Sequence, residues 1–205
     1  MSAFFVAGAH TDIGKTHVGC AVLRAARARG LSVDALKPAV SGIDPAEMGG
    51  SDSGRLLAAM GVAMTPESLD RISPWRFATP LAPPMAARRE GKTLTLAALE
   101  TVCRERLAAN AADLFLLEGV GGVMSPIAED ATGLELQARL GLPVLLVGGG
   151  YLGAVSHTLT AIETLRSRGL SIAAVVVSQD ADPAAPSFAE QVEMVKSYAG
   201  APVPA

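Results

Sequence analysis

The chain has 205 residues, of which 50% are hydrophobic and 18% are charged, with a formal net charge of −3 at pH 7. This size suits a substantial core, and we expect residues 1–205 to form one α/β domain. The small, balanced charge offers no basic surface for nucleic acid and no polybasic membrane anchor. No apolar run approaches the roughly 18 residues of a membrane span. The N-terminus lacks the basic segment of a signal peptide, so we expect a soluble, cytosolic protein.

Apolar strand signals alternate with helical periodicity along the chain. A strand at 3–8 precedes a helix at 15–29, which Gly30 ends. The next expected elements are a strand at 31–37, helices near 51–60, 66–72 and 95–109, a strand at 114–117, a helix near 132–140, a strand at 143–147, a helix at 153–168, a strand at 171–177 and a helix near 187–198. Residues 73–91 carry four prolines, so we expect much of this segment to be irregular.

The run from Gly8 to Thr16, GAHTDIGKT, is the most informative motif. It joins a strand to a helix, as a phosphate-binding loop does, and its main-chain N–H groups would cradle phosphate oxygens. Lys15 would reach the β- and γ-phosphates, and the Thr16 hydroxyl would lie on Mg²⁺. Five residues, where four are usual, separate Gly8 from Gly14, with Ala9 at the expected first glycine. A helix that begins by chance with Gly-Lys-Thr is the alternative, which the order of strand, loop and helix disfavours.

This order of elements predicts a three-layer α/β fold of the P-loop NTPase type, with a parallel sheet and helices on both faces. Right-handed crossovers would bring the carboxyl ends of the strands to one edge, where ligands bind. Cys20 and Cys103 match no metal or redox spacing, and we expect both to be reduced thiols in the core.

Three charged residues near this edge are candidates for chemistry. Glu118 follows four apolar residues, at the position of an acid that helps to hold Mg²⁺ in P-loop enzymes; the alternative is a solvated strand end. Asp52 is the second candidate carboxylate, or else a plain helix cap. Lys37 precedes Pro38 and would stabilise charge on a transferring phosphoryl group, unless it is an ordinary surface lysine at a turn.

Neutral groups lie at the same edge. Thr11 and Ser41 are hydroxyl donors near the loop. The segment 153–156 opens a helix whose free N–H groups suit a carboxylate, although an ordinary loop is the better explanation of this segment taken alone. The three histidines show no metal spacing.

Taken together, these motifs resemble the dethiobiotin synthetase family. The resemblance rests on Gly8-x-x-Thr11-x-x-Gly14-Lys15-Thr16, Lys37-Pro38-x-x-Ser41-Gly42, Ser51-Asp52, Pro74-Trp75-x-Phe77-Ala78-x-Pro80-x-x-Pro83, Glu118-Gly119-x-Gly121-Gly122 and Leu152-Gly153-x-x-x-His157. The match covers nearly the whole chain in the correct order. His10 stands where the family often has aspartate, Tyr151 where it often has lysine, and Gln179 where an asparagine commonly reads adenine. The sequence ends at Ala205, before a segment that helps to cover the base, so base preference stays open.

The resemblance implies an ATP- and Mg²⁺-dependent ligase of biotin synthesis. It would close 7,8-diaminononanoate and CO₂ to dethiobiotin through a carbamate and a carbamic–phosphoric anhydride. The implied catalytic residues are Lys15, Lys37 and Thr11, and Thr11 and Ser41 would hold the carbamate. The implied metal residues are Thr16, Asp52 and Glu118.

The resemblance also implies a nucleotide site and a shared substrate site. The nucleotide residues are Asp12, Ile13, Gly14, Lys15, Thr16, His17, Asp52, Glu118, Gly119, Val120, Gly121 and Gln179. Leu152, Gly153 and Ser156 would bind the substrate carboxylate from the partner subunit of a homodimer.

Two other classes share parts of this pattern. A partitioning or division-site ATPase switch would bind protein partners, but its loop usually carries an extra lysine near its start, where this chain has Ala9 and His10. A corrinoid amidoligase would need a glutamine-hydrolysing domain, for which the chain is too short.

Overall fold

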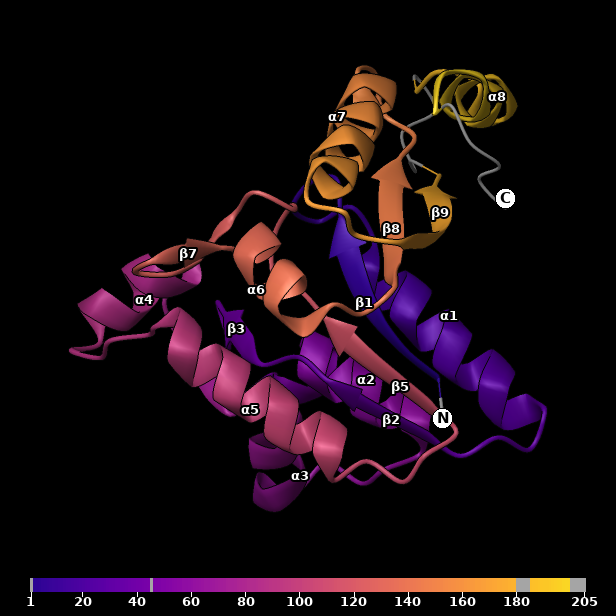
Figure 1. Ribbon diagram of the computed structural model, residues 1–205. Coiled ribbons are helices and arrows are strands. Elements are labelled where there is room, and N and C mark those ends of the chain that lie inside the picture. The colour runs from indigo at the N-terminus through magenta and orange to yellow at the C-terminus, as the bar shows by residue number, and fades with distance from the viewer. Residues whose placement is uncertain (1, 45, 180–184, 200–205) are drawn as a thin grey trace.

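Five parallel strands form the central sheet of the computed structural model, which describes residues 2–44, 46–179 and 185–199 (Figure 1). The strands lie in the order β2 (Val33–Leu36), β5 (Leu114–Glu118), β1 (Ser2–Gly8), β8 (Val144–Gly149) and β9 (Ile172–Ser178). Each neighbouring pair is parallel. The predicted parallel sheet is therefore confirmed, with β1 at its centre.

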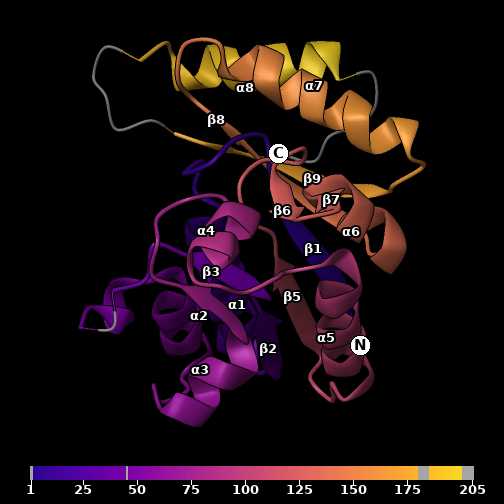
Figure 2. The same ribbon diagram turned by 90° about the vertical axis from the view of Figure 1, so that its left-hand side faces the viewer.

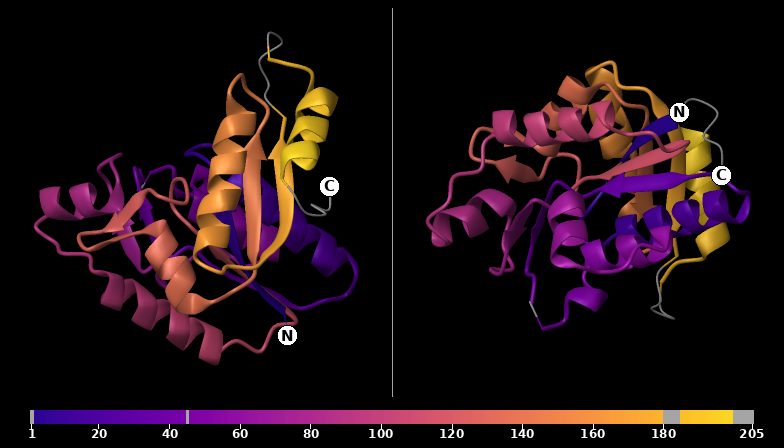
Figure 3. Two further views of the ribbon diagram at one scale, coloured as in Figure 1. Left: turned by 45° about the horizontal axis from the view of Figure 1, so that its top comes forward. Right: turned by 90° about the horizontal axis from the view of Figure 1, so that it is seen from below.

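Helices cover both faces of this sheet, as the sequence predicts. One face carries α1 (Lys15–Ala28), α2 (Asp52–Met60) and α3 (Pro66–Ile72); the other carries α5 (Leu96–Ala108), α6 (Gly133–Leu140), α7 (Ala154–Ser167) and α8 (Phe188–Tyr198). Seen from below, α1 and α5 lie on opposite sides of the strands (Figure 3).

Alternation along the strands divides the core into two clusters. Phe5 packs toward α5 to α8, and the next residue, Val6, packs toward α1 and α2. Phe115 likewise belongs to the first cluster and Leu116 to the second, because successive side chains of a strand point to opposite faces. Burying one such side chain contributes roughly 1.5–3 kcal/mol.

The proline-rich segment is more regular than predicted. It contains a short strand, β4 (Trp75–Phe77), which pairs in parallel with β3 (Ala39–Ser41). It also contains α4 (Pro83–Arg89), where the prolines occupy the first turn. Proline suits that turn because its missing N–H has no partner there in any case. The residues of the segment 73–91 outside β4 and α4 are irregular, as expected for much of it.

The remaining small elements are η1 (Met48–Gly50) and the antiparallel strands β6 (Pro126–Ala128) and β7 (Ala131–Thr132). Cys20 and Cys103 are buried and unpaired, as predicted, and burial raises the pKa of Cys103 to about 12.

Within the described ranges, no helix combines the length and the apolar character that crossing a membrane requires.

Candidate active site

The phosphate loop connects β1 to α1 through two residues with left-handed backbone. Asp12 has φ 53° and Gly14 has φ 98°. A Cβ at Gly14 would also come within 2.8 Å of the Ser178 hydroxyl. Both the left-handed backbone and this close approach therefore favour glycine at position 14. No described side chain caps the N-terminus of α1 at Gly14. The N–H groups of the first turn are thus free for an anion.

Lys15 lies inside a cavity of about 330 Å³ beside this loop. Its ammonium donates a hydrogen bond to the main-chain oxygen of His10 at 3.2 Å. Burial, and then the nearby charge of Lys37, lowers the pKa of Lys15 to about 8. Lys37 lines the same cavity, so both lysines border one space.

The second lysine is the centre of an ionic cluster in which Lys37 and Glu118 are buried and Asp52 is half-buried. Lys37 is 3% exposed, and its Nζ lies 2.5 Å from Asp52 Oδ2 and 2.6 Å from Glu118 Oε1. The Thr16 hydroxyl donates to the same Glu118 oxygen at 2.6 Å. Burial alone would lower the pKa of Lys37, but the two carboxylates outweigh it and the pKa is raised. Burial would raise the pKa of Asp52, and Lys37 outweighs it, so that pKa is lowered.

These contacts decide between the alternatives that the sequence left open. Lys37 is not a surface lysine, and Glu118, at 1% exposure, is not a solvated strand end. Asp52 is not the cap of α2: the cap is Ser51, whose hydroxyl accepts from the N–H of Gly54 at 3.2 Å. Asp52 instead turns its carboxylate toward Lys37.

The oxygen atoms around Lys37 also fit a magnesium ion. Mg²⁺ prefers one or two carboxylates together with phosphate oxygens and water, and Thr16, Asp52 and Glu118 offer two carboxylates and a hydroxyl. Glu118 Oε2 is buried without a hydrogen-bond partner among the described residues. A buried, unsatisfied carboxylate oxygen costs free energy until a donor or a cation meets it. The donor set therefore suits Mg²⁺ once the ammonium of Lys37 has moved aside.

Most of the predicted ligand residues gather at this cavity. Its wall includes Thr11, Asp12, Gly14, Thr16, His17, Ser41, Val120 and Gly121. Glu118 lies behind Lys37 and does not line it. Ile13 is buried in the core, and Gly119 packs against the ring of Phe5, where a Cβ would come within 2.9 Å. Gln179 is exposed, one residue beyond Ser178 at the end of β9.

Sequence reasoning missed Arg55, which also lines the cavity. Its guanidinium forms no ion pair with any residue of the described ranges. Arg55 lies three residues after Asp52 on α2, and residues at this spacing share a helix face. That spacing was the available signal.

The predicted carboxylate-binding residues lie elsewhere. Leu152, Gly153 and Ser156 line a hollow of about 930 Å³ between α7 and α8, which lie side by side (Figure 2). Gly153 is the N-cap residue that precedes α7; it has φ 94° and provides no side-chain cap, and Leu152 is 86% exposed. Within one chain, the structure does not bring these residues to the cavity that holds Lys15.

Comparison with known proteins shows the family to which the chain belongs. A family model described as an AAA domain matches residues 2–205. The ATP-dependent dethiobiotin synthetase of Phenylobacterium zucineum is 62% identical over 200 residues, which cover 98% of this chain and 86% of that protein. The chain belongs to the dethiobiotin synthetase family. Its relatives include the synthetases of Caulobacter vibrioides (54% identical, covering 97% of this chain and 88% of the relative) and Methylobacterium nodulans (52%, covering 98% and 90%).

Solved structures confirm the predicted P-loop fold of this dethiobiotin synthetase family member. A ParA family ATPase from Chlorobium tepidum has a TM-score of 0.55 at 12% identity, covering 99% of this chain and 82% of that one. A chain of the MinC:MinD cell division protein complex of Aquifex aeolicus also gives a TM-score of 0.55, at 13% identity, covering 96% of this chain and 78% of that one. Identities this low show the fold alone, so they lend no support to a partitioning or division-site function.

Proposed function

We propose that the chain is an ATP-dependent dethiobiotin synthetase in which Lys15 and Lys37 act together on the γ-phosphoryl group of ATP. The observation that carries this proposal is the buried cluster of Lys37, Asp52, Glu118 and Thr16 next to Lys15. Two cations and a set of hard oxygen donors at one cavity are what phosphoryl transfer needs, because that chemistry depends on positioning and charge neutralisation.

The proposed reaction has three steps. One amine of 7,8-diaminononanoate adds to CO₂ and loses a proton, which gives a carbamate. A carbamate oxygen then attacks the γ-phosphorus of ATP, so a new P–O bond forms as the bond to ADP breaks. The second amine attacks the carbonyl carbon of this carbamic–phosphoric anhydride, which closes the ring and expels phosphate.

The lysines supply positive charge to the second step. Lys15 and the free N–H groups of α1 would bind the β- and γ-phosphates. Lys37 would stabilise the charge that develops on the transferring group, a contribution typically worth about 10²–10³ in rate for one placed donor. The hydroxyls of Thr11 and Ser41 line the same cavity and would hold the carbamate.

Thr16, Asp52 and Glu118 would hold Mg²⁺, which neutralises phosphate charge when it is bound. Asp52 and Glu118 are also the two carboxylates that pair with Lys37. Moving the Lys37 ammonium away from them frees oxygens for the metal and a cation for the substrate. One displacement therefore prepares both parts of the site.

The rest of the nucleotide would follow the loop and its neighbours. Asp12, Gly14, His17, Val120 and Gly121 line the cavity, which supports their assignment. Gln179 follows Ser178, whose hydroxyl approaches Gly14, so the end of β9 adjoins the loop. We keep Ile13 and Gly119 as contacts through their main chain only, because their positions are fixed by core packing.

We further propose a homodimer in which α7 of the partner binds the substrate carboxylate at Leu152, Gly153 and Ser156. The uncapped N-terminus of α7 and the exposure of Leu152 support this. A cytosolic location and a single domain over residues 1–205 remain predictions of the sequence.

Phosphate release tests the proposed function. The purified chain with Mg²⁺ and ATP should release phosphate only when diaminononanoate and bicarbonate are both present, with one dethiobiotin formed per phosphate. An ATPase switch would ignore both compounds. Phosphate release that is unchanged when either compound is omitted would overturn the proposal.

A further inference from the structure

Three aromatic rings meet beside the phosphate loop, and the proposed reaction uses none of them. His10 comes from the loop, Tyr151 from the turn after β8, and His157 from α7. The ring of His10 stacks on that of His157, with centroids 5.8 Å apart and an interplanar angle of 14°. Tyr151 lies 6.2 Å from His10 and 5.7 Å from His157, at 67° and 52°. We call these three residues the aromatic clamp.

Hydrogen bonds fix the orientation of the clamp. The Tyr151 hydroxyl and His157 Nδ1 lie 2.6 Å apart and share a hydrogen bond. The ring of Tyr151 packs closely on Gly149, because a Cβ at that position would come within 2.7 Å of the ring. The tyrosine therefore ties His157, and through it α7, to the end of β8.

His10 connects the clamp to two residues that the proposed mechanism uses. Its Nδ1 donates to the main-chain oxygen of Thr11 at 2.8 Å. Its own main-chain oxygen accepts the hydrogen bond from Lys15 Nζ at 3.2 Å. The same residue thus contacts Lys15 through its backbone, Thr11 through its ring nitrogen, and α7 through its ring face.

The clamp also adjoins a second cavity, next to the one that contains Lys15. Thr11 lines both the cavity of about 330 Å³ that contains Lys15 and a neighbouring one of about 450 Å³. His10 and His157 line the second cavity. A shift of His10 would consequently move groups on both sides of Thr11. Misplacement of reacting groups by about 1 Å costs about 10²-fold in rate.

We propose that His10 is a positioning residue: by stacking on His157 it holds the carbonyl that receives the Lys15 ammonium and the main chain of Thr11 in their working positions. This inference rests on the proposed function, because it concerns the same phosphoryl transfer. It adds that α7, through His157 and Tyr151, sets the geometry of the phosphate loop.

The test compares variants that separate the ring stack from the hydrogen bond. His10→Ala removes both, His10→Phe keeps a ring that stacks, and His157→Ala removes the opposite ring. We expect His10→Ala to lower kcat by about 10–100-fold, while affinity for a non-hydrolysable ATP analogue stays within about threefold, because main-chain N–H groups still bind it. His10→Phe should recover most of the lost kcat.

His157→Ala should reproduce the loss, and the double variant His10→Ala/His157→Ala should be no worse than either single one, since both remove the same stack. Phe188→Ala, which removes a partly exposed ring from α8 outside the clamp, is the matched control and should keep wild-type kcat. Thermal melting of each variant shows whether a loss of rate is a loss of fold.

Equal losses in His10→Ala and His10→Phe, or additive losses in the double variant, would overturn the clamp. So would a His10→Ala enzyme within about twofold of wild-type kcat. Dethiobiotin formation by the wild-type chain is measured first. Its absence would count against the proposed function, whereas the variants report on the clamp only when it is present.

Discussion

In the cavity beside the phosphate loop, the groups that the chemistry needs already contact one another, whereas the hollow between α7 and α8 presents its groups to solvent. Lys37, Asp52 and Glu118 form ion pairs at 2.5 and 2.6 Å. Leu152, at the other region, is 86% exposed. This difference is the reason for proposing that one chain completes the nucleotide half of the site and that a second copy completes the carboxylate half.

The largest effect should come from the centre of the buried cluster. Lys37→Met should lower turnover by about 10²–10³-fold, because a placed charge donor is lost. It should also lower the free energy of unfolding by up to about 3–5 kcal/mol, because two carboxylates lose their cation. Added Mg²⁺ should restore that stability more than it stabilises the wild type, as thermal melts would show.

Lys92→Met is the control for this change, because Lys92 is an exposed lysine whose pair with Glu90 spans 3.1 Å. It should leave turnover and the response to Mg²⁺ unaltered. Near-normal turnover of Lys37→Met would remove Lys37 from the mechanism.

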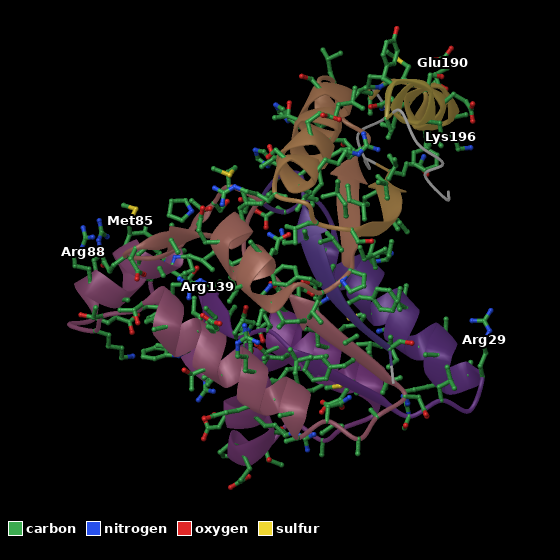
Figure 4. The ribbon with its side chains drawn as sticks, in the orientation of Figure 1. Arg29, Met85, Arg88, Arg139, Glu190 and Lys196 are labelled. Atoms are coloured by element: carbon green, nitrogen blue, oxygen red, sulfur yellow. The ribbon has the colours of Figure 1, made fainter. Side chains whose placement is uncertain are left out.

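Glu118→Gln should come next in size. Losing one carboxylate of the proposed metal site should raise the Mg²⁺ concentration for half-maximal rate by about 10–100-fold. Glu129→Gln is the matched control, since Glu129 pairs with Arg88 on the outer end of α4 (Figure 4). An unchanged Mg²⁺ titration of Glu118→Gln would refute its assignment to the metal.

Leu152→Glu should separate the two regions. A charge at the proposed interface would face its own copy, and like charges across an interface cost several kcal/mol. We expect a monomer by sedimentation, with kcat/KM for diaminononanoate at least about tenfold lower and an unchanged affinity for an ATP analogue.

Met85→Glu adds the same charge at an exposed apolar position on α4, far from α8 where Glu190 and Lys196 lie (Figure 4). It should stay dimeric and active. If Leu152→Glu also stays dimeric with full activity, the shared substrate site is wrong.

The smallest expected effect is a pH dependence of anion binding. The pKa of Lys15 is about 8, so in the free chain Lys15 loses its positive charge as the pH rises above 8. A bound triphosphate would favour the protonated, charged form of Lys15. Affinity for metal-free ATP should therefore fall above pH 8, approaching about tenfold per pH unit. Lys37 keeps its proton over this range because its pKa is raised.

Lys15→Arg tests that assignment by calorimetry, because arginine stays protonated throughout this range. Its affinity should change far less with pH. A wild-type affinity that is flat from pH 7 to 10 would show that Lys15 does not titrate as described.

The sequence predicted the parts of the molecule that follow from local pattern. The alternation of strands and helices predicted the parallel sheet, and Gly14-Lys15-Thr16 predicted the loop. Strand ends then located Lys37 and Glu118 at one edge, because the crossover rule makes carboxyl ends meet.

Features that depend on side-chain packing were beyond the sequence. The pairing of Lys37 with both carboxylates needs distances between residues that are 15 and 81 positions apart. The stack of His10 on His157 joins loop and helix across most of the chain. Regular structure in the segment 73–91 was missed because prolines were read as breakers, although Pro83 and Pro84 lie in a first turn that tolerates them.

A crystal structure of the chain with diaminononanoate, a non-hydrolysable ATP analogue and Mg²⁺ tests the account most directly. We predict that Lys37 leaves Asp52 and Glu118 for the γ-phosphate and the amine end of the substrate, that Thr16 and the freed carboxylates hold the metal, and that the substrate carboxylate lies on α7 of the partner. A complex in which Lys37 stays paired with both carboxylates while the substrate carboxylate contacts only its own chain would contradict it.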